Sequence, residues 1–198
     1  MIKRGFDIFF SSIGIFFLFP AFLFISLFIV IESRGGIFFS QKRVGRDNRD
    51  FFLLKFRTMK TGSEKGSQLT IGSRDPRITN VGYFLRKNKL DELPQLINVF
   101  LGDMSFVGPR PEVRKYVDLY TPEQKRILSL KPGITDYSSI FYSDESELLS
   151  KAANPEEFYI SRVMPEKIKM SLKYLENGGI GADFKIIFLT ILKILRIK

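Results

Sequence analysis

The side chains best suited to chemistry lie in residues 89–111, KLDELPQLINVFLGDMSFVGPRP. An adjacent acidic pair, Asp91 and Glu92, and an arginine between two prolines, Arg110, bracket an apolar run. The chain has no histidine and no cysteine, which excludes an imidazole base, a thiol nucleophile and a His/Cys metal site. Any catalysis must therefore use carboxylates, hydroxyls, cationic side chains and oxygen-bound metal ions.

Two roles are open to the acidic pair. It precedes Pro94 and an apolar series, so it could simply stabilise a helix N-terminus, where the dipole favours negative charge. Alternatively, the carboxylates could hold Mg²⁺ while Arg86, Arg110, Lys55 and Arg57 bind phosphate, which is the equipment of phosphoryl transfer. A carboxylate can also attack phosphorus directly, so the histidine-free composition favours a covalent aspartyl intermediate.

The segments around the acidic pair predict how these groups are positioned. Residues 37–43 and 51–57 are apolar and aromatic, and the sequence GRDNR between them is rich in turn formers. This pattern predicts a β-hairpin with Lys55 and Arg57 projecting from one face. Residues 61–80 are small and polar and predict a long mobile loop, a lid or a binding loop.

Later in the chain, two sequences are typical of helix starts. They are TPEQ at residues 121–124 and NPEE at residues 154–157, each with a capping residue followed by proline. Between them, the chain-breaking sequence KPG leads into residues 134–142, for which we expect a loop or a short strand.

Size and charge restrict the partners. With 198 residues, the chain has room for one domain and accessory segments. Lys and Arg outnumber Asp and Glu by 31 to 21, giving a net charge of +10. This charge favours nucleic acid, anionic lipid or phosphorylated substrates, without choosing among them. The absence of cysteine fits a reducing compartment.

Residues 8–31 predict a membrane segment. They contain no charged residue, and as a helix they would extend about 36 Å, slightly more than the roughly 30 Å hydrocarbon core of a bilayer. The apolar run is too long for a cleavable signal peptide, and no cleavage pattern follows it.

Pro20 lies near the middle of this segment and should bend it. The segment could span the bilayer with a bend, or enter it, break at Pro20 and return to the same side. Lys3 and Arg4 precede the run, and the chain after it is also basic. Because basic flanks favour the cytoplasm, we expect the re-entrant form.

The C-terminal residues 183–198 predict a second membrane-associated element. On a helix, Lys185, Lys193 and Arg196 fall on one side and leave a wide apolar face. This arrangement suits a helix lying in the membrane interface. The alternative is a helix packed on the domain core, with its cationic ends in solvent.

Several motifs, in the same order, resemble those of the monotopic phosphoglycosyl transferases. These are bacterial sugar transferases that initiate glycan assembly on a polyprenyl phosphate. The motifs are KRGFDIFF, FFSQKRVGR, LLKFRTM, LRKNKLDELPQLINVFLGDMSFVGPRP and KPGIT. They extend from residue 3 to about residue 135, and several linked motifs are far more specific than a lone acidic pair.

The resemblance implies an enzyme of the bacterial cytoplasmic membrane with its catalytic domain on the cytoplasmic face. Such an enzyme transfers a sugar 1-phosphate from a UDP-sugar to undecaprenyl phosphate and releases UMP, with Mg²⁺ as cofactor and without nucleic acid as partner. The family's catalytic pair falls on Asp91, the nucleophile, and Glu92, which positions it or binds the metal with it. The family arginines that hold phosphate fall on Arg86 and Arg110.

The resemblance also implies the architecture, an α+β, predominantly helical fold. Residues 1–34 would form a re-entrant membrane helix broken at Pro20, residues 35–180 a cytosolic helical catalytic domain with a small β-hairpin, and residues 181–198 an amphipathic interfacial helix. Because the chain lacks the additional N-terminal membrane helices of larger relatives, we expect a minimal catalytic unit.

One departure limits the inference. Many family members continue PGITG with a tryptophan, whereas this chain has PGITDYSS, so the sugar cannot be carried over. We hypothesise that residues 136–142 line the sugar or nucleotide side of the site; the alternative is a structural loop. Two other functions stay open, a membrane-anchored basic binding module without catalysis and an enzyme that transfers the sugar alone and releases UDP.

Overall fold

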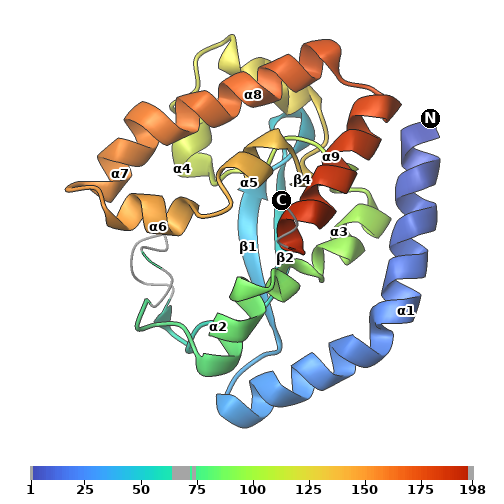
Figure 1. Cartoon of the computed structure of the whole chain (residues 1–198), viewed down its shortest axis with the longest axis vertical. Coiled ribbons are helices and arrows are strands. Elements are labelled where there is room, and N and C mark those ends of the chain that lie inside the picture. Colours follow the sequence, from blue (N-terminus) through green and yellow to red (C-terminus); the bar gives the residue numbers. More distant parts are fainter. Residues whose placement is uncertain (1, 64–71, 73–74, 196–198) are drawn as a thin grey trace.

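The computed structural model describes residues 2–63, 72 and 75–195. Helices predominate, and they surround two small sheets (Figure 1). Strands β1, Phe38–Val44, and β2, Asp50–Phe56, form an antiparallel hairpin in which Phe38 lies opposite Phe56. Strands β3, Ser105–Val107, and β4, Gly133–Thr135, pair in parallel. The predicted hairpin and the predominantly helical α+β class are confirmed.

The helices lie on both sides of the hairpin. In chain order, the α-helices are α1 Ile2–Glu32, α2 Asn80–Lys87, α3 Gln95–Leu101, α4 Arg114–Val117, α5 Tyr137–Phe141, α6 Glu145–Ser150, α7 Pro155–Phe158, α8 Met164–Asn177 and α9 Ile180–Ile194. Shorter 3₁₀ helices are η1 Arg46–Asn48, η3 Leu90–Glu92 and η4 Gln124–Ser129, and a π-helix, η5 Tyr159–Val163, joins α7 to α8.

The predicted apolar N-terminal helix is α1, and within the described residues it is the one helix long and apolar enough to cross a membrane. It consists of two limbs joined by a bend (Figure 1), and Pro20 lies inside it. The second limb packs on the domain through Ile29, which is buried with Phe56 and Leu85.

Polar contacts tie both ends of α1 to the rest of the chain. Arg4 donates to the carbonyl oxygen of Val99 at 2.6 Å, near the end of α3. The buried carboxylate of Asp7 accepts from the hydroxyl of Ser105 at 3.0 Å, beside β3. At the other end, Glu32 accepts from the backbone N–H of Asn80 at 2.7 Å, in the first turn of α2.

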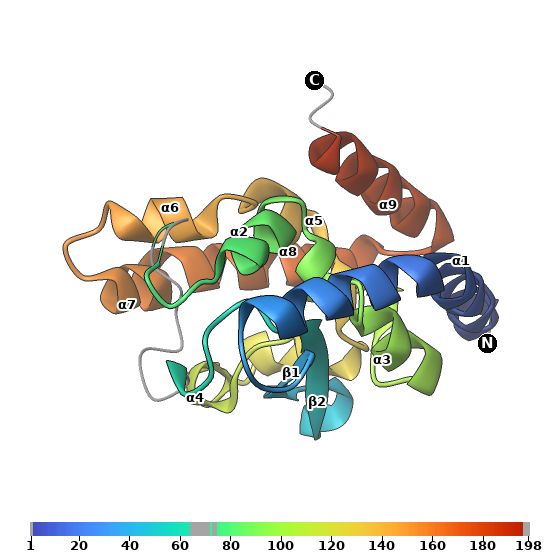
Figure 2. The same ribbon diagram turned by 90° about the horizontal axis from the view of Figure 1, so that it is seen from below.

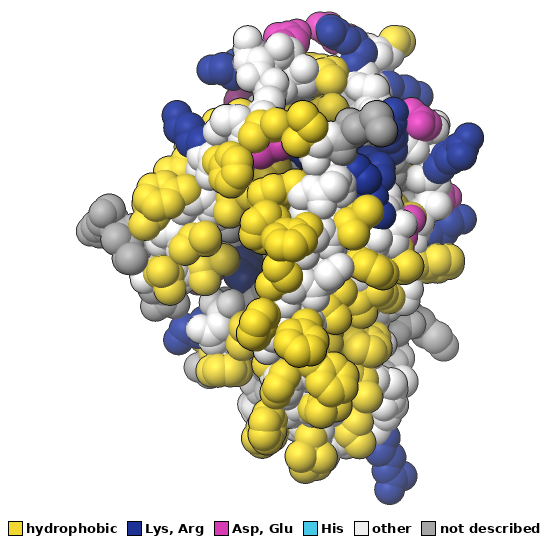
Figure 3. Space-filling model, turned by 90° about the vertical axis from the view of Figure 1, so that its right-hand side faces the viewer, with side chains coloured by type: hydrophobic (Ala, Val, Ile, Leu, Met, Phe, Trp, Pro, Cys, Tyr) yellow, Lys and Arg dark blue, Asp and Glu magenta, His cyan; other side chains and the backbone are white. Residues whose placement is uncertain are grey.

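The outer face of α1 is a continuous hydrophobic surface. Figure 3 shows hydrophobic side chains covering this side of the molecule, with most of the visible Lys and Arg side chains at its margins. Its exposed members on α1 include Phe16, Phe17, Phe24, Leu27, Phe28 and Ile31. Exposed apolar patches of this extent mark a surface for another molecule or a membrane.

Helix α9 lies beside the N-terminal limb of α1 (Figures 1 and 2). The rings of Phe6 and Phe184 meet edge to face at 5.6 Å, and Lys3 forms an ion pair with Asp183 at 2.8 Å. Ile186 is buried in the domain core, so the core-packed alternative describes one side of α9. Its other side still exposes phenylalanine and isoleucine, and the interfacial location stays a prediction.

Three expectations are refined by the structure. The capping box at Thr121 forms, with reciprocal bonds between Thr121 and Gln124, but it starts the 3₁₀ helix η4 and not an α-helix. Residues 134–142 form the end of β4 and then α5. Half of the predicted loop 61–80, residues 64–71 and 73–74, lies outside the described residues; Ile78, near its end, pairs with Met59, just before its start.

Two glycines allow the backbone after β3 to approach the backbone at the start of β4 closely. A Cβ atom on Gly108 would lie 2.2 Å from the carbonyl oxygen of Lys131, and one on Gly133 would lie 2.1 Å from the backbone nitrogen of Gly108. Both distances are far below van der Waals contact, and backbone atoms cannot move aside as side chains do. Glycine is therefore required where Arg110 begins its turn.

We predict that Gly108→Ala lowers the melting temperature in detergent micelles, because the added methyl group pushes β4 from the Arg110 turn at a cost of about 1–3 kcal/mol. The matched control is Gly181→Ala in α9, where a Cβ meets nothing within 4 Å. This control should be neutral or stabilising by up to about 1 kcal/mol. Equal melting temperatures for the Gly108 variant and the wild type would contradict the close approach.

Candidate active site

The acidic pair lies in η3, between α2 and α3. Lys89 adopts a left-handed backbone with φ of 57°, which turns the chain sharply before Leu90. Helix α3 begins at Gln95, with Pro94 as its N-cap residue and no side-chain cap bond. Neither carboxylate caps the helix, so simple capping does not describe the pair.

Glu92 is clamped between two cations from distant parts of the chain. Its Oε1 atom accepts from Lys55 Nζ, on β2, at 2.7 Å and from Arg110 Nη2 at 2.7 Å. The Glu92 side chain is only 14% exposed. Charge-assisted bonds of this length in a buried setting are strong and hold all three groups in one arrangement.

Asp91 has the opposite surroundings. The residue is 6% exposed, and its Oδ1 atom has no hydrogen-bond partner among the residues that the structure describes. Lys55 and Arg86 are the cations whose charges act on it most strongly. A buried oxygen without a partner is rare and calls for a functional explanation.

These surroundings move the two pKa values in opposite directions. Burial, reinforced by the charge of Glu92, raises the pKa of Asp91 despite the nearby cations. Burial would also raise the pKa of Glu92, but Arg110 and Lys55 together hold it well below its usual range. Carboxylates whose pKa values are driven apart in one site are a signature of divided chemical roles.

The geometry therefore favours different tasks for the two carboxylates. Glu92 is fully engaged and suited to positioning, because moving it would break two charge-assisted bonds. Asp91 is desolvated and uncommitted, so its ionised form is the more reactive and has an oxygen available for a phosphorus atom or a metal ion.

The acidic pair supplies two carboxylates that could bind Mg²⁺ through oxygen. Within the described part of the chain, no group of three or more Asp, Glu, His or Cys residues could hold a metal ion. Magnesium is commonly bound by one or two carboxylates together with substrate phosphates and water. The unpartnered Oδ1 of Asp91 fits such a site, with Glu92 as the adjacent second carboxylate.

The four predicted phosphate ligands have different positions. Lys55 and Arg110 reach Glu92 directly, as described above. Arg86 is within electrostatic range of Asp91, and its Nε donates to Thr58 Oγ1 at 2.8 Å. Arg57 is buried elsewhere: its guanidinium donates to the carbonyl oxygens of Ser33 and Arg34 at 2.7 and 2.6 Å. These contacts indicate that Arg57 secures the chain after α1.

Asn98 is a positioning residue that the sequence analysis missed. It is buried in α3, where its Oδ1 accepts from the backbone N–H of Leu54 at 2.9 Å and its Nδ2 donates to the carbonyl oxygen of Phe52 at 2.8 Å. This side chain fixes the helix that follows Glu92 against the strand that carries Lys55. An asparagine in an apolar run was the available signal, since a buried amide needs partners.

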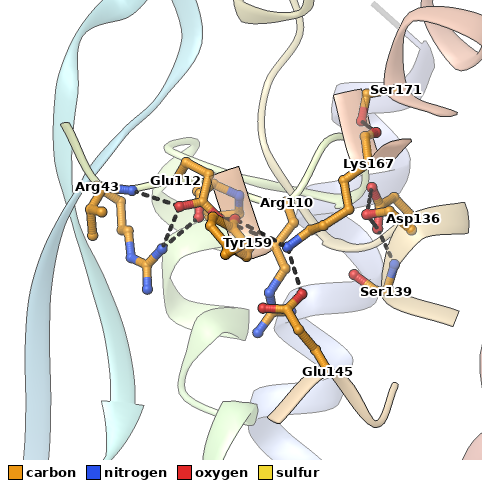
Figure 4. A network of polar contacts seen from close by, with 12 residues as sticks. Arg43, Arg110, Glu112, Asp136, Ser139, Glu145, Tyr159, Lys167 and Ser171 are labelled. Atoms are coloured by element: carbon orange, nitrogen blue, oxygen red, sulfur yellow. Dashed lines mark hydrogen bonds and ion pairs between the residues drawn. The ribbon is translucent and has the colours of Figure 1, made fainter. Parts of the chain in front are cut away.

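The segment that departs from the family pattern lies near Arg110. Asp136 is the N-cap of α5 and accepts from the backbone N–H of Ser139 at 2.7 Å. The charges of Asp136 and Glu145 act on the Arg110 guanidinium, whose pKa is raised first of all by Glu92. Figure 4 shows Arg110 in the centre, with Asp136 and Ser139 to its right and Glu145 below. That residues 136–142 line the sugar or nucleotide side of the site stays a prediction.

Comparisons with known proteins identify the family of the chain. A sequence model described as bacterial sugar transferase matches residues 1–197. The chain is similar to a UDP-N-acetylgalactosamine-undecaprenyl-phosphate N-acetylgalactosaminephosphotransferase of Aeromonas hydrophila, with 37% identity over 98% of the chain and 44% of the relative.

Two further relatives differ in how much of their own length the chain covers. A UDP-glucose:undecaprenyl-phosphate glucose-1-phosphate transferase of Escherichia coli (strain K12) is 33% identical over 98% of the chain and 40% of its own length. The exopolysaccharide production protein ExoY of Rhizobium meliloti (strain 1021) is 32% identical over 96% of the chain and 84% of its own length. The chain thus spans less than half the length of the first two relatives.

The opposite pKa shifts predict opposite effects on stability. The pKa of Asp91 is higher in the folded than in the unfolded state, so its ionisation above the unfolded pKa destabilises the fold. The pKa of Glu92 is lower in the folded state, so its ionisation stabilises the fold. At neutral pH, Asp91→Asn should raise the melting temperature, whereas Glu92→Gln should lower it, by roughly 2–4 °C for each kcal/mol.

The measurement is thermal unfolding in detergent micelles from pH 8 down to pH values well below 4.5, the ordinary pKa of a glutamate. The stabilising contribution of Glu92 should be lost as the pH falls through its depressed folded pKa, so wild type and Glu92→Gln should converge in acid. Two variants shifted in the same direction at neutral pH would contradict the division of roles.

Proposed function

Because the chain belongs to the bacterial sugar transferase family, we propose that it transfers a sugar 1-phosphate from a UDP-sugar to undecaprenyl phosphate. The product starts the assembly of a bacterial glycan, and UMP is released. The relatives named for undecaprenyl-phosphate substrates support the donor and acceptor classes. The single observation that carries the mechanism is the buried, unpartnered Oδ1 of Asp91 beside the clamped Glu92.

The proposed reaction has two displacements at one phosphorus atom. An Asp91 carboxylate oxygen attacks the phosphorus that bears the sugar, and the bond from that phosphorus to the oxygen bridging to the UMP phosphate breaks. The electron pair leaves with UMP. An oxygen of undecaprenyl phosphate then attacks the same phosphorus, and Asp91 is released as a carboxylate. Neither step requires a proton transfer, which suits a chain without histidine.

The surrounding cations have distinct tasks in this scheme. Arg110 holds Glu92 with one nitrogen, so its fork is already oriented when a diphosphate arrives. Lys55 donates to the same oxygen of Glu92, and its charge also acts on Asp91. Arg86 adds positive charge near Asp91, where the phosphoryl group is transferred. The phosphate-binding role first expected for Arg57 is not part of this proposal.

Asp91 and Glu92 are the residues that would hold Mg²⁺. When bound, the ion supplies charge neutralisation for the donor diphosphate and the leaving UMP. The clamp on Glu92 leaves its Oε2 without a hydrogen bond from the described residues, so both carboxylates can offer an oxygen without dismantling the clamp.

For the membrane, we propose that α1 is re-entrant and that the catalytic domain lies on the cytoplasmic face of the inner membrane. Arg4 and Glu32, near opposite ends of α1, both bond to the domain that carries Asp91. A straight spanning helix would separate these ends by the bilayer thickness. The hydrophobic outer faces of α1 and α9 then enter the lipid and bring the site close to the acceptor phosphate.

The nucleotide released by the purified protein tests the reaction. With undecaprenyl phosphate, Mg²⁺ and a panel of UDP-sugars, the wild type should release UMP, and Asp91→Asn should lose more than about 10³-fold in rate. Vesicle binding of the variant serves as the control for folding and should be unchanged. Release of UDP would indicate transfer of the sugar alone, and no release would favour a binding module.

The absence of cysteine makes the topology directly measurable. Single substitutions Ile2→Cys and Lys42→Cys lie at exposed positions on either side of α1. A membrane-impermeant maleimide should label both in inside-out vesicles and neither in right-side-out vesicles. Labelling of the two sites from opposite sides would establish a spanning helix and contradict the re-entrant form.

A further inference from the structure

A buried polar network lies behind the turn that carries Arg110. Figure 4 shows Arg43, Glu112, Tyr159, Lys167 and Glu145 arranged around this turn. The elements that supply them are far apart in sequence, since Arg43 comes from β1 and Lys167 from α8. None of the five has a role in the transfer described above.

The first contact holds the main chain directly after Arg110. Arg43 Nη1 donates to the carbonyl oxygen of Pro111 at 3.0 Å and lies 3.7 Å from Glu112 Oε2. The backbone N–H of Val44 donates to the carbonyl oxygen of Glu112 at 2.8 Å. Strand β1 therefore holds both residues that follow Arg110, although the described residues of β1 form no hydrogen bond with the acidic pair.

The second contact holds the Glu112 side chain from the opposite direction. The Tyr159 hydroxyl donates to Glu112 Oε1 at 2.6 Å, and Lys167 Nζ lies 3.9 Å from the same oxygen. Lys167 also pairs with Glu145 Oε2 at 2.9 Å. The side chains of Glu112 and Lys167 are only 13% and 10% exposed, so these bonds are made away from water.

The π-helix explains how Tyr159 and Lys167 reach one carboxylate. In an unbroken α-helix, residues eight apart differ by about 80° around the axis. The wider π turn, which starts at Tyr159, takes up about one extra residue and reduces this difference to roughly 20°. Accordingly, the Lys167 ammonium lies 5.2 Å from the centre of the Tyr159 ring. Single π turns recur at functional sites.

Stability alone is a poor reason for such a network. Well-packed apolar residues usually stabilise a core as well as buried ion pairs do, because of the desolvation cost. What a satisfied network provides is a single geometry. Here that geometry is imposed on Pro111 and Glu112, which follow Arg110 immediately and restrain where its guanidinium points.

We propose that Arg43 and Tyr159 are positioning residues for phosphosugar transfer, which act through Pro111 and Glu112 to orient Arg110 on Glu92 and the donor diphosphate. The inference rests on the proposed function, because it concerns the same phosphate-binding arginine. Neither residue needs to touch the substrate, and both should affect the rate of the first displacement more than donor binding.

The test uses Tyr159→Phe and Arg43→Lys. The first removes the hydroxyl that contacts Glu112 and Lys167 and keeps the ring; the second removes the guanidinium that bonds to Pro111 and Gln41 and keeps the charge. The matched control is Tyr116→Phe. The Tyr116 ring packs 4.9 Å from that of Tyr159 in the same core, but its hydroxyl makes no hydrogen bond among the described residues. The control therefore removes an equivalent hydroxyl without touching the Arg110 turn.

Each protein, in lipid nanodiscs, is mixed with a saturating amount of the UDP-sugar that the wild type uses fastest, and UMP is quantified in a single turnover. We expect the rate constant to fall about tenfold in both variants, equivalent to about 1.4 kcal/mol for one lost hydrogen bond to a charged group. The burst amplitude, the amount of UMP released in the first turnover, counts folded sites and should stay at the wild-type value. In Tyr116→Phe, both the rate constant and the burst amplitude should equal those of the wild type.

Each other result overturns a specific statement. Wild-type rate constants in both variants, or a loss confined to burst amplitude, would reduce the network to a structural role. An equal fall in the Tyr116→Phe control would show that the effect comes from the core and not from the turn. A wild-type protein that releases no UMP with any donor would instead contradict the proposed function, on which this inference rests.

Discussion

The shared Oε1 atom of Glu92, held by Lys55 and Arg110, is the interaction on which the site depends. It joins the hairpin, η3 and the Arg110 turn, three segments that have no sequence continuity. Both of these bonds go to Glu92, whereas the adjacent Asp91 is buried with no hydrogen bond to its Oδ1 among the described residues. Electrostatic pairing of one carboxylate thus leaves its neighbour reactive, and stability is given up at the position where chemistry is needed.

A few polar contacts also hold helix α1, which carries the hydrophobic outer surface, on the domain. Helix α1 is tied down at both ends by polar bonds, and its middle packs through apolar side chains and exposes a hydrophobic face. Since α3 follows the acidic pair and Arg4 bonds to the last turn of α3, the depth of α1 in a bilayer would set the distance from Asp91 to a lipid phosphate. The buried amide of Asn98 completes the link by fixing α3 to β2.

Local patterns predicted the hairpin, the apolar helix with Pro20 inside it, and the acidic pair with Arg110, because turn chemistry and hydrophobic runs act over a few residues. Partners that meet across the fold were not predictable. The alternation of side chains along a strand predicted that Arg57 lies on the same face as Lys55, but Arg57 follows the last residue of β2 and bonds to the chain after α1. The π turn at Tyr159 likewise has no local sequence signal.

The covalent step is the central claim, and mass spectrometry of the intact protein tests it most directly. The protein in nanodiscs is incubated with Mg²⁺ and its UDP-sugar in the absence of undecaprenyl phosphate, and is then denatured and weighed. The account predicts an added mass of one sugar phosphate, located on Asp91, formed together with one equivalent of UMP and lost when the acceptor lipid is supplied. Release of UMP on adding the lipid, without any adduct beforehand, or an adduct that persists in Asp91→Asn, would contradict it.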